Sequence, residues 1–394
     1  MNTQELGKHL SLAVLGTITL MQLLALPAMV GVITDGSGLT EQQAGVAASA
    51  KFFGGALVAL LMAFQMHRLP LRSAAMAALL LAAAADFASA YSAHSFNLFL
   101  FARFCAGIGT GIAYVATIAA YARSHDPERG YGIFVTLQFT VSGLALYVLP
   151  VYSSNLGVEG MFLIIAGLDI TALLFCGALP KMSADKEKSA DHLHGIAISG
   201  SSLKVLTTSA ALFGIIAFGL YEAANTAQFT YIERLGVAMQ FSEHEIGRAL
   251  LIASFIGIPG AFSVVLLGGR FGHTVPIIVG ITVAIIGLVL VIMADSYSGY
   301  FMGGILLGFS WAFCLPFIQG LLAGLDRTGG VLAAGSFCTT VGATIGPYWA
   351  ARLIDDNQYD GVFIMAIGLF AIAALFFVGA RPKSSVKEAT PCLN

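Results

Sequence analysis

The sequence contains very little charge. Only 10% of its 394 residues are charged, whereas 58% are hydrophobic. A soluble domain spends about a quarter of its residues on charge, so this composition excludes an ordinary cytosolic enzyme, a nucleic-acid-binding protein and a disordered chain. The net charge of −2 also offers no basic surface for phosphates, and we expect no nucleic-acid partner. The chain is therefore predicted to be a polytopic membrane protein.

Residue types that hold metals or cofactors are scarce in the apolar parts of the chain. None of the eight histidines falls within a long apolar run, and imidazole is the usual ligand of a metal or haem. The five cysteines show neither a disulfide framework nor a metal-binding spacing. No Walker-type phosphate loop is present, so ATP is not expected to drive the protein from within this chain. The sequence predicts no cofactor, no metal site and no catalytic residue.

The chain has long apolar runs in place of charge. A membrane-spanning helix needs about 20 mostly apolar residues, with its backbone groups paired inside the helix. The first run follows Lys8 and His9 and is longer than the apolar region of a cleaved signal sequence, so we interpret it as a retained span. We predict twelve spans near residues 11–33, 44–66, 71–92, 96–121, 131–153, 160–180, 208–232, 246–268, 275–294, 299–323, 331–352 and 361–380.

The basic residues are distributed unevenly between the two sides of these spans. With the N-terminus inside, 14 of the 19 lysines and arginines fall in cytoplasmic segments. This distribution is the positive-inside pattern. We therefore predict a multi-pass protein of the cell membrane with both termini in the cytoplasm, and we expect that membrane to be the inner membrane of a bacterium.

The two halves of the chain share landmarks at nearly constant spacing. The segment TEQQAG at 40–45 reappears as SEHEIG at 242–247, and each is typical of a helix start with a hydroxyl N-cap followed by a carboxylate. Arg68 and Arg270 are separated by the same 202 residues. The duplication predicts an N-terminal six-helix bundle at 1–180, a cytoplasmic linker at 181–207, a C-terminal six-helix bundle at 208–381 and a cytoplasmic tail at 382–394.

Several motifs resemble those of the major facilitator superfamily. RFCAGIGTG at 103–111 resembles its R-x-x-x-G-x-x-x-G signature, and GRFGH at 269–273 is similar to its D-R-x-G-R loop. The corresponding loop of the first half, HRLPLR at 67–72, lacks the usual Asp and Gly. The resemblance implies an all-α integral membrane protein in which twelve transmembrane helices form two pseudo-symmetric six-helix bundles. It also implies gating loops that contain Arg68, Arg72, Arg270 and Gly272.

Glu222, near the centre of the seventh predicted span, is the strongest candidate for a functional group. A charged side chain inside a span is costly, so it marks a functional site by default. A carboxyl group in a poorly hydrated cavity can exchange a proton near neutral pH, and it can also bind a cationic or hydroxylated solute. A structural hydrogen bond between helices is the alternative. The same helix face and its borders hold Tyr221, Asn225, Thr226, Gln228 and Phe229.

Four other ionisable residues fall within predicted spans. Arg103 stays charged at any working pH and needs a carboxylate, carbonyl groups, water or an anionic solute, and the family resemblance implies a role in coupling. Asp169 lies on a span that the family uses mainly as scaffold, so it either pairs with Lys51 or forms a second protonatable site. We interpret Asp86 and Lys51 as side chains that extend to the outer interface. The proton-coupling candidates are Glu222, Asp169 and Arg103.

Polar and aromatic side chains on four spans complete the predicted binding site. The resemblance implies that the first, fourth, seventh and tenth spans line the cavity. Prolines such as Pro27 and Pro316 mark bends in these spans. A cavity with amides, hydroxyls, aromatics and one charge of each sign suits a small organic solute better than a bare ion. The predicted substrate-binding residues are Gln22, Arg103, Tyr114, Tyr221, Glu222, Asn225, Gln228, Trp311 and Gln319.

Together these features predict a secondary active transporter of a small organic solute, coupled to protons and working by alternating access between two halves. A channel or a transport-inactive membrane sensor is the alternative. An intramembrane enzyme is disfavoured, because no G-x-S-x-G or comparable nucleophile motif occurs. Uptake and efflux both use such an architecture, so the direction stays open. The expected partners are the solute, protons and membrane lipid, and we expect a monomer.

Overall fold

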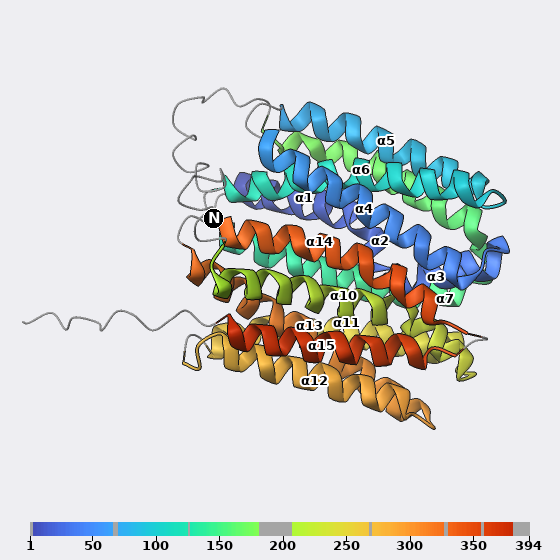
Figure 1. The fold of residues 1–394 in the computed structure, drawn as a ribbon. Coiled ribbons are helices and arrows are strands. Elements are labelled where there is room, and N and C mark those ends of the chain that lie inside the picture. Colours follow the sequence, from blue (N-terminus) through green and yellow to red (C-terminus); the bar gives the residue numbers. More distant parts are fainter. Residues whose placement is uncertain are drawn as a thin grey trace, which may run out of the picture.

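The computed structural model describes residues 3–65, 70–124, 127–180, 207–267, 270–326, 330–355 and 358–380. The predicted linker and the predicted tail lie almost entirely outside these residues, and so does Arg68. Within the described ranges the chain is nearly all helical, and its one extended pairing is an isolated bridge between Asp355 and Gln358. The helices run roughly side by side in one elongated bundle (Figure 1). We call the end of this bundle opposite the N-terminus the distal end.

The first predicted span is divided into three helices. Ala25, with φ −110° and ψ 14°, interrupts the helical backbone just before Pro27, whose ring nitrogen has no hydrogen to donate. The break leaves Gln22 on a helix of four residues. The helices of the first half are α1 (Thr3–Thr19), α2 (Met21–Leu24), α3 (Leu26–Ser37), α4 (Glu41–Gln65), α5 (Leu71–Ser92), α6 (Phe96–Ala122), α7 (Pro127–Ala172) and the 3-10 turn η1 (Leu173–Ala178).

The fifth and sixth predicted spans are joined in α7. Gly157 interrupts this helix with φ 58° and ψ −177°, a backbone conformation that favours glycine. The second half contains α10 (Ser209–Ala238), α11 (Glu243–Leu267), α12 (Thr274–Ile292), α13 (Tyr297–Leu325), α14 (Gly330–Ala350), the 3-10 turn η2 (Ala351–Leu353) and α15 (Asp360–Gly379). Ten segments of the described residues are long and apolar enough to cross a membrane. The count of twelve stays a prediction, because the broken first span and α14 are not among these ten.

The helices form two groups that meet along two seams. In the first half α4 and α5 pack on α6, and in the second half α11 and α12 pack on α13 in the same arrangement. The halves meet where α4 contacts α14 and where α7 contacts α11 (Figure 1). Glycine permits the close approach of α4 and α6, because a Cβ added at Gly107 would lie 2.8 Å from the carbonyl carbon of Lys51. Gly107 therefore serves the packing of these two helices.

Equivalent helix starts show the duplication in atomic detail. At the start of α4 the Gln43 amide N–H donates to Thr40 Oγ1 at 3.2 Å, and the Thr40 N–H donates to Gln43 Oε1 at 3.0 Å. At the start of α11 the same reciprocal pair joins Ser242 and Glu245, at 3.3 and 3.0 Å. Each is a capping box that satisfies backbone donors of the first turn. The hydroxyl N-caps predicted from the repeated segments are therefore present in both halves.

Candidate functional site

A cavity of about 130 Å³ lies between the two halves. The first half contributes side chains from α2 and α7, and the second half contributes side chains from α10, α11 and α13. Its polar lining consists of Gln138, Ser142, Glu222, Asn225, Thr226, Gln228 and Ser254 together with the Trp311 indole. A cavity that both halves share is the place where a relative movement of the halves changes access to a bound solute.

The predicted face of the seventh span lines this cavity. Glu222, Asn225, Thr226 and Phe229 all contribute to its wall, as helical periodicity requires. Glu222 is partly exposed to the cavity, and its carboxyl group interacts with the side chain of Trp311 on α13. Asn225 Nδ2 donates to the backbone carbonyl of residue 221 at 2.9 Å, which holds the amide in place. The structure therefore brings Glu222, Asn225, Gln228 and Trp311 together, as predicted.

Three other predicted lining residues lie elsewhere. The Tyr221 ring is fully buried against Phe370 of α15, where the ring centroids are 5.5 Å apart. Tyr114 packs within the first half beside Phe134, with ring centroids 6.5 Å apart. Gln319 is exposed on α13 and does not contribute to the cavity wall. These residues share helices with the cavity, but the direction in which a side chain leaves its helix depends on how the helix is rotated in the bundle.

Arg103 lies in a buried charge network inside the first half, which we define as Gln22, Asp86, Ser89 and Arg103. The guanidinium forms an ion pair with Asp86, and its Nη1 donates to Gln22 Oε1 at 2.9 Å. Its Nε donates to Ser89 Oγ at 3.0 Å, and Gln22 Nε2 donates to Asp86 Oδ1 at 2.8 Å. The Arg103 guanidinium also lies over the Phe162 ring, 4.3 Å from its centroid. Arg103 therefore has the carboxylate partner that a buried cation needs.

This network lies outside the central cavity. Gln22 and Arg103 line a separate cavity of about 20 Å³, together with Lys51 and apolar side chains of α3 and α4. The central cavity therefore does not contain the predicted charge of each sign. Among its lining residues in the described chain, Glu222 is the single charged side chain.

The positions predicted for Asp86 and Lys51 are wrong. Their relative exposures are 0% and 8%, so neither side chain extends to the outer interface. The Asp86 carboxylate is paired with Arg103, so it is stabilised inside the bundle without contact with water. The described residues also contain no ion pair between Asp169 and Lys51. Asp169 is buried, and no N–H or hydroxyl donor reaches its two carboxyl oxygens. It interacts with the neighbouring carboxyl group of Asp86 and with the cations Lys51 and Arg103.

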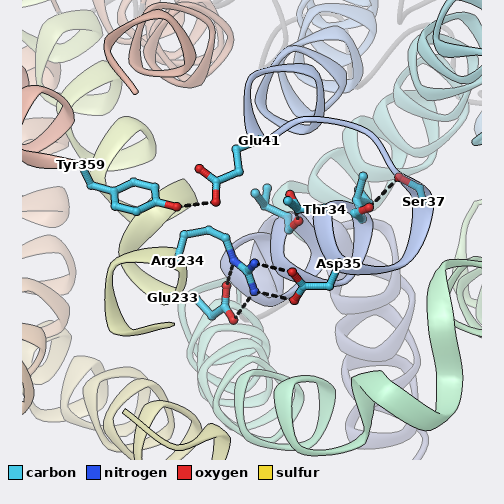
Figure 2. A network of polar contacts seen from close by, with 9 residues as sticks. Thr34, Asp35, Ser37, Glu41, Glu233, Arg234 and Tyr359 are labelled. Carbon is cyan, nitrogen blue, oxygen red and sulfur yellow. Dashed lines mark hydrogen bonds and ion pairs between the residues drawn. The ribbon is translucent and has the colours of Figure 1, made fainter. Parts of the chain in front are cut away.

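A second set of charged side chains joins the two halves at the distal end (Figure 2). Arg234 of α10 donates to both carboxyl oxygens of Asp35 on α3, from Nη1 at 2.7 Å and from Nη2 at 2.9 Å. The same guanidinium donates to both oxygens of its neighbour Glu233, at 2.7 and 3.0 Å. Such two-pronged contacts match the planar fork of arginine. One arginine thus holds a carboxylate of each half.

Glu41 and Tyr359 add a further link between the halves at the same end. The Tyr359 hydroxyl donates to the Glu41 carboxylate (Figure 2). The Tyr231 hydroxyl donates to the Glu41 backbone carbonyl at 3.3 Å. Burial and the hydrogen bond to Glu41 raise the pKa of Tyr359, so its hydroxyl stays protonated and able to donate. We define the interface network as Asp35, Glu41, Glu233, Arg234 and Tyr359. Its contacts join the two halves at the distal end.

Sequence reasoning did not identify the interface network. Asp35 and Arg234 lie near the ends of their apolar runs, where charged residues are common and attract no attention. One signal was present, because Arg234 is among the few basic residues on the side opposite the termini. Recognising its partner required the relative placement of α3 and α10, which lie 199 residues apart in sequence.

Three of the four predicted gating residues lie in the described chain. Arg72 is half-buried near the start of α5, and Arg270 is exposed in the turn between α11 and α12. Gly272 has φ 63°, a left-handed conformation that favours glycine at this position of the loop. Their role in gating stays a prediction.

Comparison with known proteins identifies the fold and the family. The model of the Major Facilitator Superfamily matches residues 11–347. A crystal structure of the nucleoside transporter NupG superposes with a TM-score of 0.71 at 13% identity, covering 96% of this chain and 99% of the transporter. A crystal structure of a D-xylose-proton symporter superposes with a TM-score of 0.73 at 15% identity, covering 95% of this chain and 96% of the symporter. No curated protein matches the sequence.

Proposed function

Because the chain belongs to the Major Facilitator Superfamily and is therefore a secondary transporter and not an enzyme, we propose that it carries a small organic solute and that this transport is coupled to protons. The central cavity carries this proposal, since it lies between the halves and contains a carboxyl group on the wall that α10 supplies. Its polar side chains can orient a small organic solute, while its apolar wall excludes water. The proposed cycle is alternating access, in which the halves rock about the bound solute.

The interface network supports the proposed movement. It joins α3 and α4 of the first half to α10 and to Tyr359, just before α15, in the second half. Opening the distal end requires these contacts to break, whereas the buried charge network lies within one half and can stay intact. In this proposal the first half moves as one body, and the contacts that change during the cycle are those between the halves.

We assign the proton to Glu222, with Asp169 as the second candidate. Glu222 faces the cavity, so binding and release of a proton there can follow solute binding directly. Asp169 is buried beside the charge network, and no N–H or hydroxyl donor reaches its oxygens. A proton on Asp169 would act through Asp86 and Arg103, with which it interacts. Arg103 is then a positioning residue, because it links the protonation of Asp169 to the packing of the helices in the first half.

Transport by purified protein in proteoliposomes tests the proposal. A thermal-shift comparison of organic acids, sugars and amines first selects a solute, because a bound solute stabilises the folded protein. We expect Glu222→Gln to lose accumulation of that solute driven by a pH gradient and to leave counterflow of labelled solute measurable at saturating solute, because counterflow needs no proton gradient. Asp169→Asn is the matched variant and should keep accumulation. Accumulation by Glu222→Gln at the wild-type level would assign the proton elsewhere, and a lack of counterflow in the wild type would contradict a carrier.

A further inference from the structure

The charge that lines the central cavity has one sign. Glu222 is the single charged side chain among its lining residues in the described chain. The two basic side chains buried in the first half do not neutralise the charge of Glu222. Arg103 is held by Asp86, and Lys51 lines the other, smaller cavity. An anionic solute in the central cavity would meet a carboxyl group and no cationic side chain.

The cavity also offers an unused hydrogen-bond acceptor. Gln228 is 5% exposed and lines the cavity, and its Oε1 atom has no hydrogen-bond partner. A buried amide oxygen without a partner costs free energy, so this atom favours a donor that arrives with the solute. The donors of Asn225 and Thr226 already bond to backbone carbonyls of their own helix. The wall that α10 supplies therefore contains one carboxyl group and one amide oxygen without a donor.

Aromatic side chains next to Glu222 form a further part of the cavity wall. Trp311 of α13 and Phe139 of α7 meet edge to face, with ring centroids 5.8 Å apart, so the two halves share this contact. Phe229 of α10 adds a third ring to the lining. Aromatic faces attract organic cations and also pack against apolar groups.

From these observations we infer that the solute is a small organic amine, bound as a cation with its ammonium group at Glu222 and its apolar body against Trp311 and Phe139. The inference rests on the proposed transport function and adds the chemical class of the solute. A quaternary ammonium would gain the charge attraction but could not donate to Gln228 Oε1. A primary amine carries three N–H donors, so it can donate to the carboxylate and still donate to a further acceptor of the wall.

Three probes of nearly equal size separate charge from shape. Phenethylamine is a cation at neutral pH, 2-phenylethanol is neutral and phenylacetate is an anion. Binding of each to the purified full-length protein in detergent is measured by calorimetry at pH 7.5. We expect the amine to bind at least about tenfold more tightly than the alcohol, and we expect no measurable binding of the acid. Glu222→Gln should remove the preference for the amine and keep the affinity for the alcohol within about twofold.

Gln228→Leu gives a second and independent measurement. It removes the unpartnered oxygen with little change in volume, so the affinity for the amine should fall by about fivefold while the affinity for the alcohol falls less. The inference would be overturned if phenylacetate bound as tightly as phenethylamine or more tightly, or if none of the three probes bound. It would also be overturned if Glu222→Gln kept the wild-type preference for the amine. These measurements report binding and use no gradient. If an amine binds but shows no counterflow, the proposed transport function is contradicted and the inferred class of ligand is not.

Discussion

The protein holds two arginines in two different ways. Arg103 and its partner Asp86 are buried inside one half, with side-chain exposures of 3% and 0%. Arg234 is buried too, at 6%, but its partner across the interface, Asp35, is 62% exposed. Breaking the first pair would leave a charge inside a packed bundle, whereas breaking the second returns one carboxylate to water. The first arrangement suits a bundle that keeps its shape, and the second suits an interface that opens.

In the proposed cycle, Glu233 lets the interface open at low cost. It bonds to Arg234 from the neighbouring position on the same helix, so it stays with the arginine when Asp35 leaves. A buried arginine without any carboxylate would be strongly disfavoured. The contact is also tight, because a Cβ added at Gly31 of α3 would lie 2.6 Å from Glu233 Oε2. The second half therefore carries its own counter-charge in both the open and the closed arrangement.

The largest expected effect comes from breaking the buried pair. Asp86→Ala removes the ion-pair partner of Arg103 inside the first half, and breaking a buried pair typically costs about 3 to 5 kcal/mol. We expect a clear fall in the midpoint of thermal unfolding in detergent. Asp35→Ala is the matched control, because Arg234 keeps Glu233 and the exposed carboxylate contributes about 1 kcal/mol or less to stability. Equal shifts in the two variants would show that the two networks do not differ as described.

The next effect concerns the opening of the distal end. Asp35→Ala removes the carboxylate of the first half and should raise the ratio of open to closed molecules by roughly fivefold, for a contact of about 1 kcal/mol. Spin labels at Glu159→Cys and Glu243→Cys, exposed positions on opposite halves, report the separation by pulsed electron resonance. An unchanged distance distribution would mean that the ion pair does not hold the distal end closed.

Glu233→Gln should act in the opposite direction. Without Glu233 the arginine depends on Asp35 alone, so leaving the closed arrangement becomes more costly. We expect the same pair of labels to show roughly threefold fewer open molecules, a change of less than about 1 kcal/mol. Glu245→Gln serves as the control, because Glu245 bonds to Ser242 within one half. A shift toward open molecules in Glu233→Gln would contradict the role of Glu233 as the permanent partner of Arg234.

The sequence was sufficient for the helices and for one wall of the cavity. Long apolar runs and the repeated helix starts at Thr40 and Ser242 predict the architecture, and helical periodicity places Glu222 beside Asn225. Contacts between helices were not predictable in this way. The pairing of Arg103 with Asp86 depends on how α5 and α6 are rotated toward each other. The hydrogen bonds of Gln22 to Arg103 and Asp86 depend on helix breaks on both sides of a four-residue helix. Spacing along the chain predicts neither the ion pair nor these hydrogen bonds.

The interface network was the least predictable feature, because it depends on the relative position of the halves. Asp35 and Arg234 bond across the two halves, and spacing along the chain does not show how two halves face each other. The same reason distinguishes the predicted site residues that line the cavity from those that do not. Asn225 and Gln228 follow from one helix, whereas Tyr221 and Gln319 required knowledge of how each helix faces its neighbours.

The smallest expected effect tests the outer part of the interface network. Tyr359→Phe removes the hydrogen bond to Glu41, and water can replace it at this partly exposed carboxylate, so the loss is about 0.5 kcal/mol. The labels at residues 159 and 243 should then report roughly twofold more open molecules. The raised pKa of Tyr359 means that the wild-type hydroxyl does not ionise as the pH rises, so the difference between variant and wild type should be constant from about pH 6 to pH 9. Tyr297→Phe is the matched control, because the Tyr297 hydroxyl donates to the Glu245 carbonyl within the second half. An equal effect in both variants would show that Tyr359 acts through general packing and not through its link across the interface.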